Sequence, residues 1–523
     1  MRLKNTNKHA RVALVGYEDQ DNLGVRYIAA VLKEAGHAVS VIVYSKDHEA
    51  VVEKVIRERP DVVGLSLIFQ SLLPEFGSLV ALLRDKGVAA HITIGGHFSS
   101  FEPETALKAI PSLDSVVLHE GEEIMLELAQ AVADGASWKD AHGIVFFDNG
   151  SVKRTPDRLA HRDLDLLPWP DRADKIYTGR LPKATMLGSR GCPWRCSFCS
   201  ITNFYAANGT KGRRLRSPDN VADEMAYLRW KKGVRVILWQ DDEFLGGGRP
   251  GVEWAHALAK ECVKRGLNHE LKWKISCRSD AVTYDHIVPL IEAGLTHVYL
   301  GVESGDRQSL KHLNKQLTPE DHFKAKEVIT GLGLTFDYGF MLLEPWSTVD
   351  TVRNNISFLR DFASDGSSVA GFCRMLPYAG TAAEKRLADE GRLQLFNDCI
   401  PDYRFLDERL DVFYDWALNA FYGWNYGEDG IVSLMRAVLF DVSVELPDRP
   451  SDTRLRREAR QLAAVSNKVM VNLLELALEY IEERVVVDLK KDETLAGLTS
   501  HAQKEEDLTR RHATRIFREI HSR

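Results

Sequence analysis

Runs of apolar residues alternate with amphipathic segments through the first part of the chain. Residues 12–16, 38–44, 62–68 and 90–94 are almost continuously apolar, and the segments between them are of helical length. Continuous apolar strands that alternate with helices are typical of a parallel sheet covered on both faces. The pattern predicts a doubly wound, flavodoxin-like domain over residues 1–145, with its ligand at the carboxyl ends of the strands.

A second alternating pattern follows a looser stretch. Residues 146–182 contain a proline-broken segment and no regular period, so we expect a linker there. Strand-like runs then recur, with helical segments between them, at residues 184–189, 234–239, 273–277, 297–301, 335–341 and 368–376. Six βα repeats over residues 183–386 predict a partial (βα)6 barrel, whose chemistry should lie at the carboxyl ends of its strands.

After residue 386 the alternation stops, and we interpret residues 387–523 as a mainly helical domain. Aromatic residues are dense at 402–426, and we expect them to pack against the barrel, with a substrate wall as the second interpretation. Apolar residues between Leu455 and Tyr480 recur at three- and four-residue steps, which predicts an amphipathic helix. The last twenty or so residues are charged, and we expect them to be frayed.

Composition is that of an ordinary soluble globular protein. Of the 523 residues, 44% are hydrophobic and 27% charged, and the formal net charge of −7 gives no support to a nucleic-acid surface. We find no apolar stretch of membrane-spanning length and no signal peptide. Seven cysteines, an odd number, do not suggest a disulfide framework. We expect a cytoplasmic protein with no nucleic-acid or membrane partner.

Three cysteines give the strongest chemical signal. Cys192, Cys196 and Cys199 directly follow the first strand of the predicted barrel. A closed iron–sulfur cube takes four cysteine ligands, so three leave one iron open to a ligand that is not protein. Zinc is the alternative, but it usually takes a second pair of Cys or His ligands, and we find none at suitable spacing. The triplet therefore favours a reactive iron–sulfur cluster.

Loops at the strand ends of the N-terminal domain are rich in glycine. Glycines let the backbone approach a bulky ligand, and a serine offers it a hydroxyl. The order of these loops resembles the cobalamin-binding domain of B12 enzymes, and a fourth loop resembles one in their radical branch. The resemblance implies cobalamin contacts at Asp19, Asn22, Leu23, Gly24, Ser66, Ile68, Gly95, Gly96, Glu120 and Gly121. A flavodoxin-like domain that binds another ligand is the alternative.

One position departs from the B12 pattern. Asp21 stands where B12 enzymes place the histidine that ligates cobalt from below, and a carboxylate is a poor substitute for imidazole there. In the radical branch this histidine is commonly missing. The resemblance therefore implies that the lower face of cobalamin need not carry a protein histidine, and it leaves the lower ligand open.

The cysteine loop resembles that of the radical S-adenosylmethionine superfamily, and the two resemblances together span roughly residues 10 to 385. They imply a [4Fe–4S] cluster on the three cysteines and S-adenosylmethionine on the open iron. Carboxylates after the second strand would receive its ammonium group, an arginine its carboxylate and a glutamate its ribose. The implied contacts are Phe198, Gln240, Asp241, Asp242, Ser276, Arg278 and Glu303. A salt-bridged structural role is the alternative for each charged residue.

A cobalamin-dependent radical S-adenosylmethionine enzyme of the methyltransferase-like branch is the combined implication. In such enzymes a 5′-deoxyadenosyl radical activates the substrate and methylcobalamin supplies the methyl group. We expect methyl transfer to an unactivated carbon, or secondarily phosphorus, of a small metabolite in secondary metabolism or cofactor biosynthesis. The electron donor would be a flavodoxin or ferredoxin.

Two alternatives and the catalytic residues stay open. The first alternative is a radical cyclisation, ring contraction or oxidation with the same cofactors. The second is a non-catalytic cobalamin-binding redox sensor. Tyr338, Cys373 and Arg374 lie near predicted strand ends and are catalytic candidates, although a role in the core fits them equally well.

Overall fold

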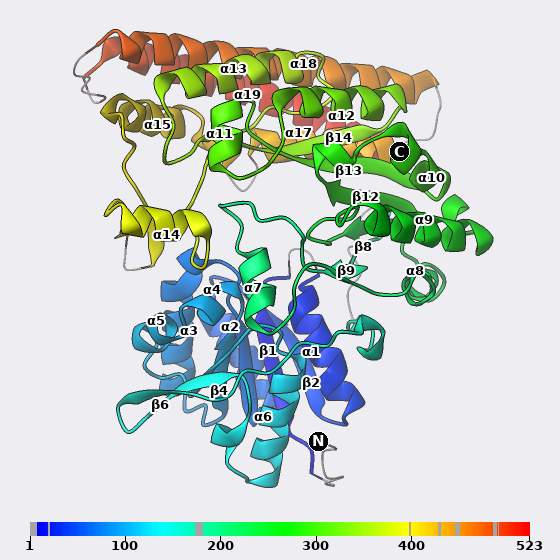
Figure 1. Cartoon of the computed structure of the whole chain (residues 1–523), viewed down its shortest axis with the longest axis vertical. Helices are drawn as coiled ribbons and strands as arrows, with labels where there is room; N and C mark the ends of the chain where they lie inside the picture. The colour runs from blue at the N-terminus through cyan, green and yellow to red at the C-terminus, as the bar shows by residue number, and fades with distance from the viewer. Residues whose placement is uncertain are drawn as a thin grey trace.

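The computed structural model describes residues 8–18, 21–172, 181–396, 399–426, 430–444, 450–484, 489 and 491–522. Asp19, one of the predicted cobalamin contacts, lies outside these residues. Figure 1 shows an N-terminal sheet at one end of the molecule, a central sheet above it and long C-terminal helices at the other end.

The N-terminal sheet has the order β2-β1-β3-β4-β5-β6-β7. Its first five strands are parallel, and the order 2-1-3-4-5 is that of a flavodoxin-like fold, as predicted. The strands are β1 (Arg11–Gly16), β2 (Ala38–Val43), β3 (Val62–Ser66), β4 (His91–Gly95), β5 (Ser115–Val117), β6 (Ile144–Asp148) and β7 (Ser151–Arg154). The antiparallel pair β6–β7 extends the sheet beyond residue 145, which we did not predict.

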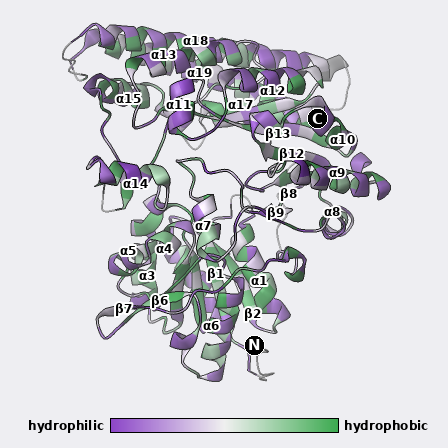
Figure 2. Cartoon of the chain, in the orientation of Figure 1, coloured by the Kyte–Doolittle hydropathy of each residue, from purple (hydrophilic) through white to green (hydrophobic). Residues whose placement is uncertain are grey.

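Helices cover both faces of this sheet. They are α1 (Leu23–Glu34), α2 (His48–Glu58), α3 (Leu73–Asp85), α4 (His97–Phe101), α5 (Pro103–Ala109) and α6 (Glu122–Asp134). Two separate apolar cores result, one between the sheet and α2, α3 and α5, the other between the sheet and α1 and α6. Because both faces are buried, the strands are continuously apolar, and Figure 2 shows them as hydrophobic.

The central sheet has the order β15-β14-β13-β12-β11-β8, and its strand pairs are parallel. This confirms the six-stranded partial barrel. Its strands are β8 (Lys183–Met186), β11 (Val236–Trp239), β12 (Lys272–Cys277), β13 (Leu295–Glu303), β14 (Thr335–Leu343) and β15 (Cys373–Arg374). A small ribbon of β9 (Ser189–Arg190) and β10 (Arg214–Leu215) lies beside it.

Helices alternate with the central strands and connect the sheet to the rest of the chain. They are α7 (Ile201–Ala207), α8 (Pro218–Lys232), α9 (Arg249–Lys264), α10 (Tyr284–Glu292), α11 (Arg307–His312), α12 (Pro319–Gly331), α13 (Val349–Phe362) and α14 (Ala382–Asp389). Figure 1 shows α7 between the central sheet and the N-terminal sheet.

The C-terminal helices share the core of the barrel. They are α15 (Glu408–Ala420), α16 (Tyr422–Asn425), α17 (Ile431–Val444), α18 (Pro450–Glu482) and α19 (Glu493–His521), preceded by a hairpin of β16 (Gln394–Phe396) and β17 (Ile400–Asp402). Phe413, Trp416, Phe421 and Trp424 are buried in the same apolar cluster as the outer face of the central sheet. Their packing role is therefore the one we expected.

Our expectation of a frayed C-terminus is wrong. The charged residues belong to α19, whose apolar positions, among them Ala502, Ala513 and Ile516, are fully buried against α15, α17 and α18. Charges occupy only its outer face, so composition alone concealed an amphipathic helix. No helix among the described residues is long and apolar enough to cross a membrane.

Candidate functional site

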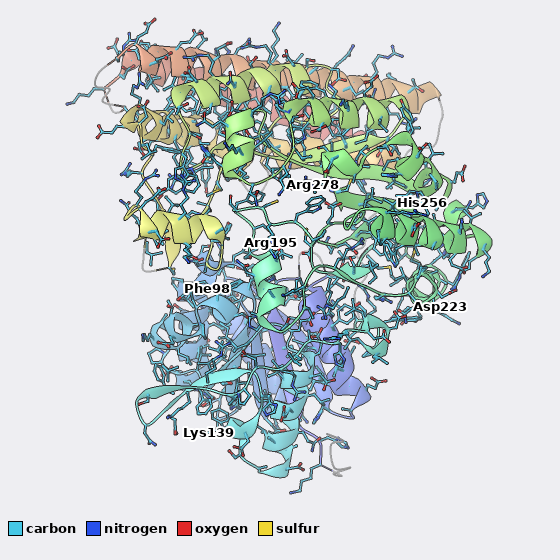
Figure 3. The ribbon with its side chains drawn as sticks, viewed as in Figure 1. Phe98, Lys139, Arg195, Asp223, His256 and Arg278 are labelled. Carbon is cyan, nitrogen blue, oxygen red and sulfur yellow. The ribbon has the colours of Figure 1, made fainter. Side chains whose placement is uncertain are left out.

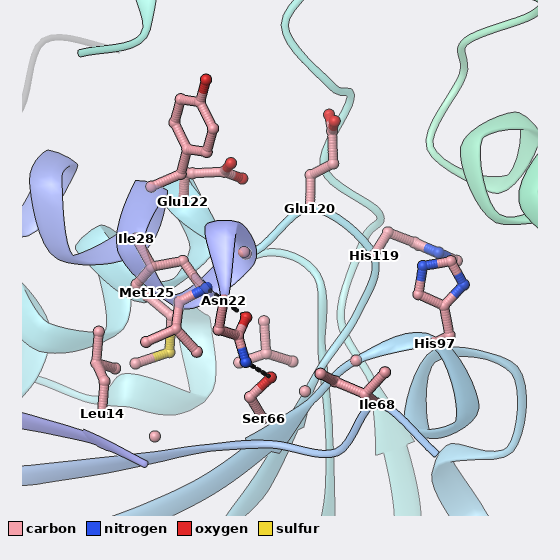
Figure 4. A pocket seen from close by; sticks show the side chains of 18 of the residues that line it. Leu14, Asn22, Ile28, Ser66, Ile68, His97, His119, Glu120, Glu122 and Met125 are labelled. Atoms are coloured by element: carbon pink, nitrogen blue, oxygen red, sulfur yellow. Dashed lines mark hydrogen bonds between the residues drawn. The ribbon is translucent and has the colours of Figure 1, made fainter. Parts of the chain in front are cut away.

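A cavity of about 440 Å³ lies at the carboxyl ends of the N-terminal strands. The loops after β1, β3, β4 and β5 line it, and Figure 4 shows their side chains around it. The lining includes most of the residues for which we expected cobalamin contacts: Asn22, Gly24, Ser66, Ile68, Gly95, Gly96, Glu120 and Gly121. Leu23 instead packs in an apolar cluster beside the interface with the central sheet.

Glycine creates this space. Gly96 has a φ of 126°, and a Cβ there would come within 2.1 Å of the carbonyl oxygen of Leu67. Asn22 donates a 3.4 Å hydrogen bond to the Ser66 hydroxyl across the floor of the cavity. Leu14, Gly64, Thr93 and Met125 extend the lining between the strands. The donor set and the open backbone fit a bulky, largely neutral ligand with an appended tail, such as cobalamin.

Two histidines of this cavity were absent from our prediction. His97 follows the two glycines after β4, and His119 lies in the loop between β5 and α6. Both pack on Phe204 of α7, with ring-centroid distances of 4.1 Å for His97 and 5.3 Å for His119. A histidine directly after a glycine pair was the available sequence signal for the first, and the second lies in the fourth loop, which resembles one in the radical branch of B12 enzymes.

Asp21 points into the interface between the two sheets. Its carboxylate accepts a hydrogen bond of 2.6 Å from Arg172 and bonds of 3.0 and 3.1 Å from the backbone N–H and hydroxyl of Thr185 on β8. Asp21 and Arg172 are both buried, and Glu224 of α8 binds the same guanidinium. Asp21, at the position where B12 enzymes place a cobalt ligand, therefore connects the N-terminal sheet to the central sheet.

A second set of ion pairs joins the same two parts of the chain. Arg190 of β9 donates to Glu120 at 2.8 Å and to Glu122 at 2.6 Å, and Arg214 of β10 donates to Glu120 at 2.6 Å. The two arginines outweigh the effect of burial and hold the pKa of Glu120 below its usual value. Glu120 thus lines the cavity while its carboxylate binds the central domain.

The three cysteines lie in a loop fixed from several sides. Asn314 and His312 at the end of α11, and Ala383 of α14, contact its backbone or Ser197. The Gly191 N–H donates to Asp242 at 2.8 Å. All three thiols are partly buried, and burial raises the pKa of Cys192 to about 12 and of Cys199 to about 11. Three thiols free of disulfides, in one ordered loop, fit a cluster with an open iron.

Glu243 and Arg278 carry unused polar atoms beside this loop. Glu243 accepts the Arg278 N–H at 2.9 Å, yet its Oε1 is buried with no hydrogen-bond partner among the described residues. Burial raises the pKa of Glu243 to about 7. One terminal nitrogen of Arg278 is likewise buried and unpaired within the described chain, and the guanidinium stacks 4.0 Å from Trp194. Figure 3 labels Arg278 at this edge of the central sheet.

These unused atoms fit the methionyl group of S-adenosylmethionine. A carboxylate suits its ammonium, and a guanidinium suits its carboxylate. The family resemblance implies an ammonium contact at Asp241 and Asp242. Asp241 instead accepts from the Gly188 N–H and the Ser189 hydroxyl and forms an ion pair with Arg213 at 3.5 Å, and Asp242 accepts the Gly191 N–H. Asp242 is exposed and accepts through Oδ2 alone, whereas Glu243, the next residue, has a buried oxygen without a partner among the described residues.

The remaining predicted contacts lie around the barrel mouth. Glu303 has a φ of 66° and pairs with the buried Lys315 at 3.2 Å. The same Lys315 lies 5.9 Å from the ring of Phe198. Ser276 accepts the Phe244 N–H through its carbonyl. Gln240 lines the cobalamin cavity, so it stands between the two sites.

The three catalytic candidates differ in their burial and in their contacts. Tyr338 is fully buried and packs 5.2 Å from Phe362, so it belongs to the core. Arg374 is bound to Asp402 and stacks over Tyr403 at 4.1 Å. Cys373 is the half-buried first residue of β15, with its thiol 3.5 Å from the carbonyl oxygen of Phe340. Cys373 alone of the three remains near the mouth without a structural partner side chain among the described residues.

Comparison with known families divides the chain as the sheets do. Residues 11–129 match the B12 binding domain, and residues 186–354 match the Radical SAM superfamily.

Relatives share both parts. An uncharacterized methyltransferase of Pyrococcus horikoshii, PH0819, is 26% identical over 368 residues, which cover 69% of this chain and 76% of that protein. The anaerobic magnesium-protoporphyrin IX monomethyl ester cyclase of Rubrivivax gelatinosus is 27% identical over 384 residues, 70% of this chain and 66% of the cyclase. The structure of OxsB, a cobalamin-dependent S-adenosylmethionine radical enzyme with aqua-cobalamin and S-adenosylmethionine bound, superimposes with a TM-score of 0.69 at 16% identity. The superposition covers 98% of this chain and 84% of the OxsB chain.

Proposed function

Because this chain belongs to the cobalamin-dependent radical S-adenosylmethionine enzymes, we propose that it transfers a methyl group to an unactivated carbon of a small metabolite. Its cofactors are a [4Fe–4S] cluster, S-adenosylmethionine and cobalamin. When bound, the cluster with S-adenosylmethionine supplies a carbon-centred radical, and cobalamin supplies a methyl carrier.

A shared wall between the two cofactor sites carries this proposal. The N-terminal loops form one side of the cobalamin cavity, and the central domain supplies the other through Leu187, Arg190, Phe204, Tyr205 and Gln240. Gly191, the residue after Arg190, begins the cysteine loop, and Phe204 and Tyr205 follow it on α7. A radical formed at the loop and a methyl carrier in the cavity would therefore act on one substrate from adjacent sites.

The chain's own residues have defined tasks in this proposal. Glu243 and Arg278 bind and orient the methionyl group, and Cys192, Cys196 and Cys199 hold the cluster. The buried pairs of Asp21 with Arg172 and of Glu120 with Arg190 keep the two sites in register. Ordered contact between the domains also excludes water from the space where a reactive radical forms.

Methyl-labelled S-adenosylmethionine tests the proposal. The anaerobically reconstituted full chain is incubated with a reductant, candidate metabolites and S-adenosylmethionine that carries a deuterated methyl group, and the products are analysed by mass spectrometry. A product that gains the labelled methyl in place of hydrogen supports methyl transfer. Formation of 5′-deoxyadenosine with a product that carries no label would contradict it.

Radical cyclisation is the second candidate, because a relative of similar identity is a cyclase. It uses the same cofactors but predicts a product of unchanged mass, or one that has lost two hydrogens. A cobalamin-binding redox sensor predicts no 5′-deoxyadenosine at all. The same mass spectra therefore separate all three.

A flavodoxin or ferredoxin is the proposed electron donor. Arg195, next to Cys196, and Lys311 of α11 are both exposed, and the Asn314 side chain that follows α11 binds the Arg195 carbonyl. Cationic side chains beside the cluster would attract a small redox protein with an acidic face. Arg195→Glu should slow reduction by such a protein at low salt and leave reduction by dithionite unchanged.

A further inference from the structure

His119 holds an unusual backbone conformation at the wall of the cobalamin cavity. Its φ of 55° lies in the left-handed region, which glycine enters freely and residues with a side chain enter at a cost. The residue lines the cavity from the loop between β5 and α6. Strained residues of this kind cluster at ligand sites, so a function for the imidazole is the natural explanation.

The ring nitrogens of His119 are poised for a ligand. Both are shielded from solvent, and neither forms a hydrogen bond with any residue that the structure describes. Buried polar atoms in proteins almost always have a partner. The ring packs edge-on against Phe204, and Figure 4 shows it next to His97 at one side of the cavity. An occupant of the cavity would supply the missing partner.

The surroundings indicate the chemistry of that occupant. Burial lowers the pKa of His97 to about 4 and also lowers the pKa of His119, so both rings are neutral near pH 7. A neutral imidazole has one N–H donor and one nitrogen acceptor. Glu120, the neighbouring carboxylate, is already bound by Arg190 and Arg214. This part of the wall suits a neutral group that both donates and accepts, such as a primary carboxamide.

We propose that His119 hydrogen-bonds a peripheral carboxamide of the corrin ring, and that His97 and Phe204 hold its imidazole in position. The edge of cobalamin carries several primary carboxamides. Phe204 lies on the helix that follows the cysteine loop, so this contact would link the edge of the corrin to the cluster side of the enzyme. The proposal depends on cobalamin binding and is independent of methyl transfer.

Equilibrium binding of hydroxocobalamin to the full-length, reconstituted chain tests the proposal. We expect His119→Gly to raise the Kd about tenfold, which corresponds to about 1.4 kcal/mol. The thermal midpoint of the cobalamin-free protein should stay the same or rise, because glycine relieves the left-handed backbone. A weaker affinity without a lower thermal midpoint indicates that a contact to cobalamin is lost. A damaged loop would instead lower the thermal midpoint as well. An unchanged Kd would overturn the proposal.

Matched variants sharpen the test. Arg59→Gly provides the same backbone relief at a φ of 49°, at the far end of the sheet, and should leave the Kd unchanged. His97→Phe keeps the stacked ring but removes its nitrogens, and the Kd should stay within about twofold of wild type. A tenfold loss in His97→Phe with an unchanged Kd in His119→Gly would make His97 the ligand and overturn the assignment.

Electron paramagnetic resonance of bound cob(II)alamin separates a carboxamide contact from cobalt ligation. The axial nitrogen splitting should be the same in wild type and His119→Gly. A splitting present in wild type and lost in the variant would make His119 a cobalt ligand, and the carboxamide assignment would be wrong.

Discussion

Both parallel sheets have their candidate site at the carboxyl ends of their strands, but the residues that form the two sites differ in kind. At the end of β4 the N-terminal sheet has Gly95 and Gly96, whose lack of a side chain leaves room for a cavity. After β11 and β12 the central sheet instead buries charges, and Glu243 and Arg278 keep polar atoms that no described residue satisfies. We propose that shape selects a large neutral cofactor at the first sheet, whereas charge selects a small zwitterionic group at the second. Four sets of variants test this contrast.

Loss of the cluster is the largest effect we expect. Cys196→Ala should reduce the iron content from about four per chain to a residual level and abolish 5′-deoxyadenosine formation, because the remaining two thiolates cannot hold the cube. Iron analysis and chromatography of the reaction mixture measure both. Cys262→Ala is the control, since Cys262 is buried between helices and should leave the cluster intact. Normal 5′-deoxyadenosine formation by Cys196→Ala would refute the ligand assignment.

Filling the N-terminal cavity should abolish cobalamin binding and leave the cluster in place. At Gly95 a Cβ would lie 3.4 Å from the carbonyl oxygen of Val117, an ordinary contact, so Gly95→Ala is the control and should still bind. Gly95→Trp projects an indole into the space for the corrin. Absorbance of bound cobalamin and iron content are measured in parallel. If Gly95→Trp binds cobalamin normally, the cavity is not the cofactor site.

Asp21→Ala should destabilise the protein by about 3 kcal/mol, because it removes one carboxylate partner of the buried Arg172. Its cob(II)alamin spectrum should match that of wild type, since Asp21 binds the central domain. Thermal unfolding and the spectrum are the two measurements. Arg172→Met added to Asp21→Ala should recover part of the stability, because it removes a buried guanidinium that keeps only Glu224 as a carboxylate partner, while Glu224 stays paired with Arg216. A changed axial ligand in Asp21→Ala would contradict this role.

The smallest effect distinguishes two neighbouring carboxylates. Glu243→Gln should raise the Kd for S-adenosylmethionine about tenfold, because it loses a charge-assisted hydrogen bond worth about 1.5 kcal/mol or more. Asp241→Asn should lower thermal stability and leave that Kd near wild type, because its oxygens bind within the protein. Equal losses of affinity in both variants would show that the unpaired oxygen of Glu243 does not identify the binding carboxylate.

Recognition by shape was easier to predict from sequence than recognition by charge. Gly95 and Gly96 end a strand, and their lack of a side chain is a property of the residues themselves. Which carboxylate after β11 stays free depends on Ser189 and Arg213, which the fold brings from elsewhere. Asp21 shows the same limit, because Arg172 lies about 150 residues away in what we interpreted as a linker.

The pattern of apolar residues along the chain predicted the fold well where burial requires those residues to be apolar. The N-terminal sheet has nearly continuous apolar strands, and the alternation of strand-like and helical segments indicated both parallel sheets, although β12 of the central sheet alternates between polar and apolar residues. The helix α19 escaped prediction because few of its residues are buried, and three of those, Ala502, Thr509 and Ala513, are small or polar. The left-handed backbone of His119 could not be predicted from the sequence either. Glycine is the residue type that signals such a conformation, and position 119 is a histidine.

The wall that the two cofactor sites share is tested most directly by the magnetic interaction between them. The protein is loaded with cob(II)alamin, the cluster is reduced to its paramagnetic state, and the relaxation of the cobalt signal is measured by electron paramagnetic resonance. Adjacent sites across Tyr205 and Gln240 predict faster relaxation of the cobalt signal in wild type and none of this effect in Cys196→Ala. A cobalt signal that does not change when the wild-type cluster is reduced would contradict the shared wall.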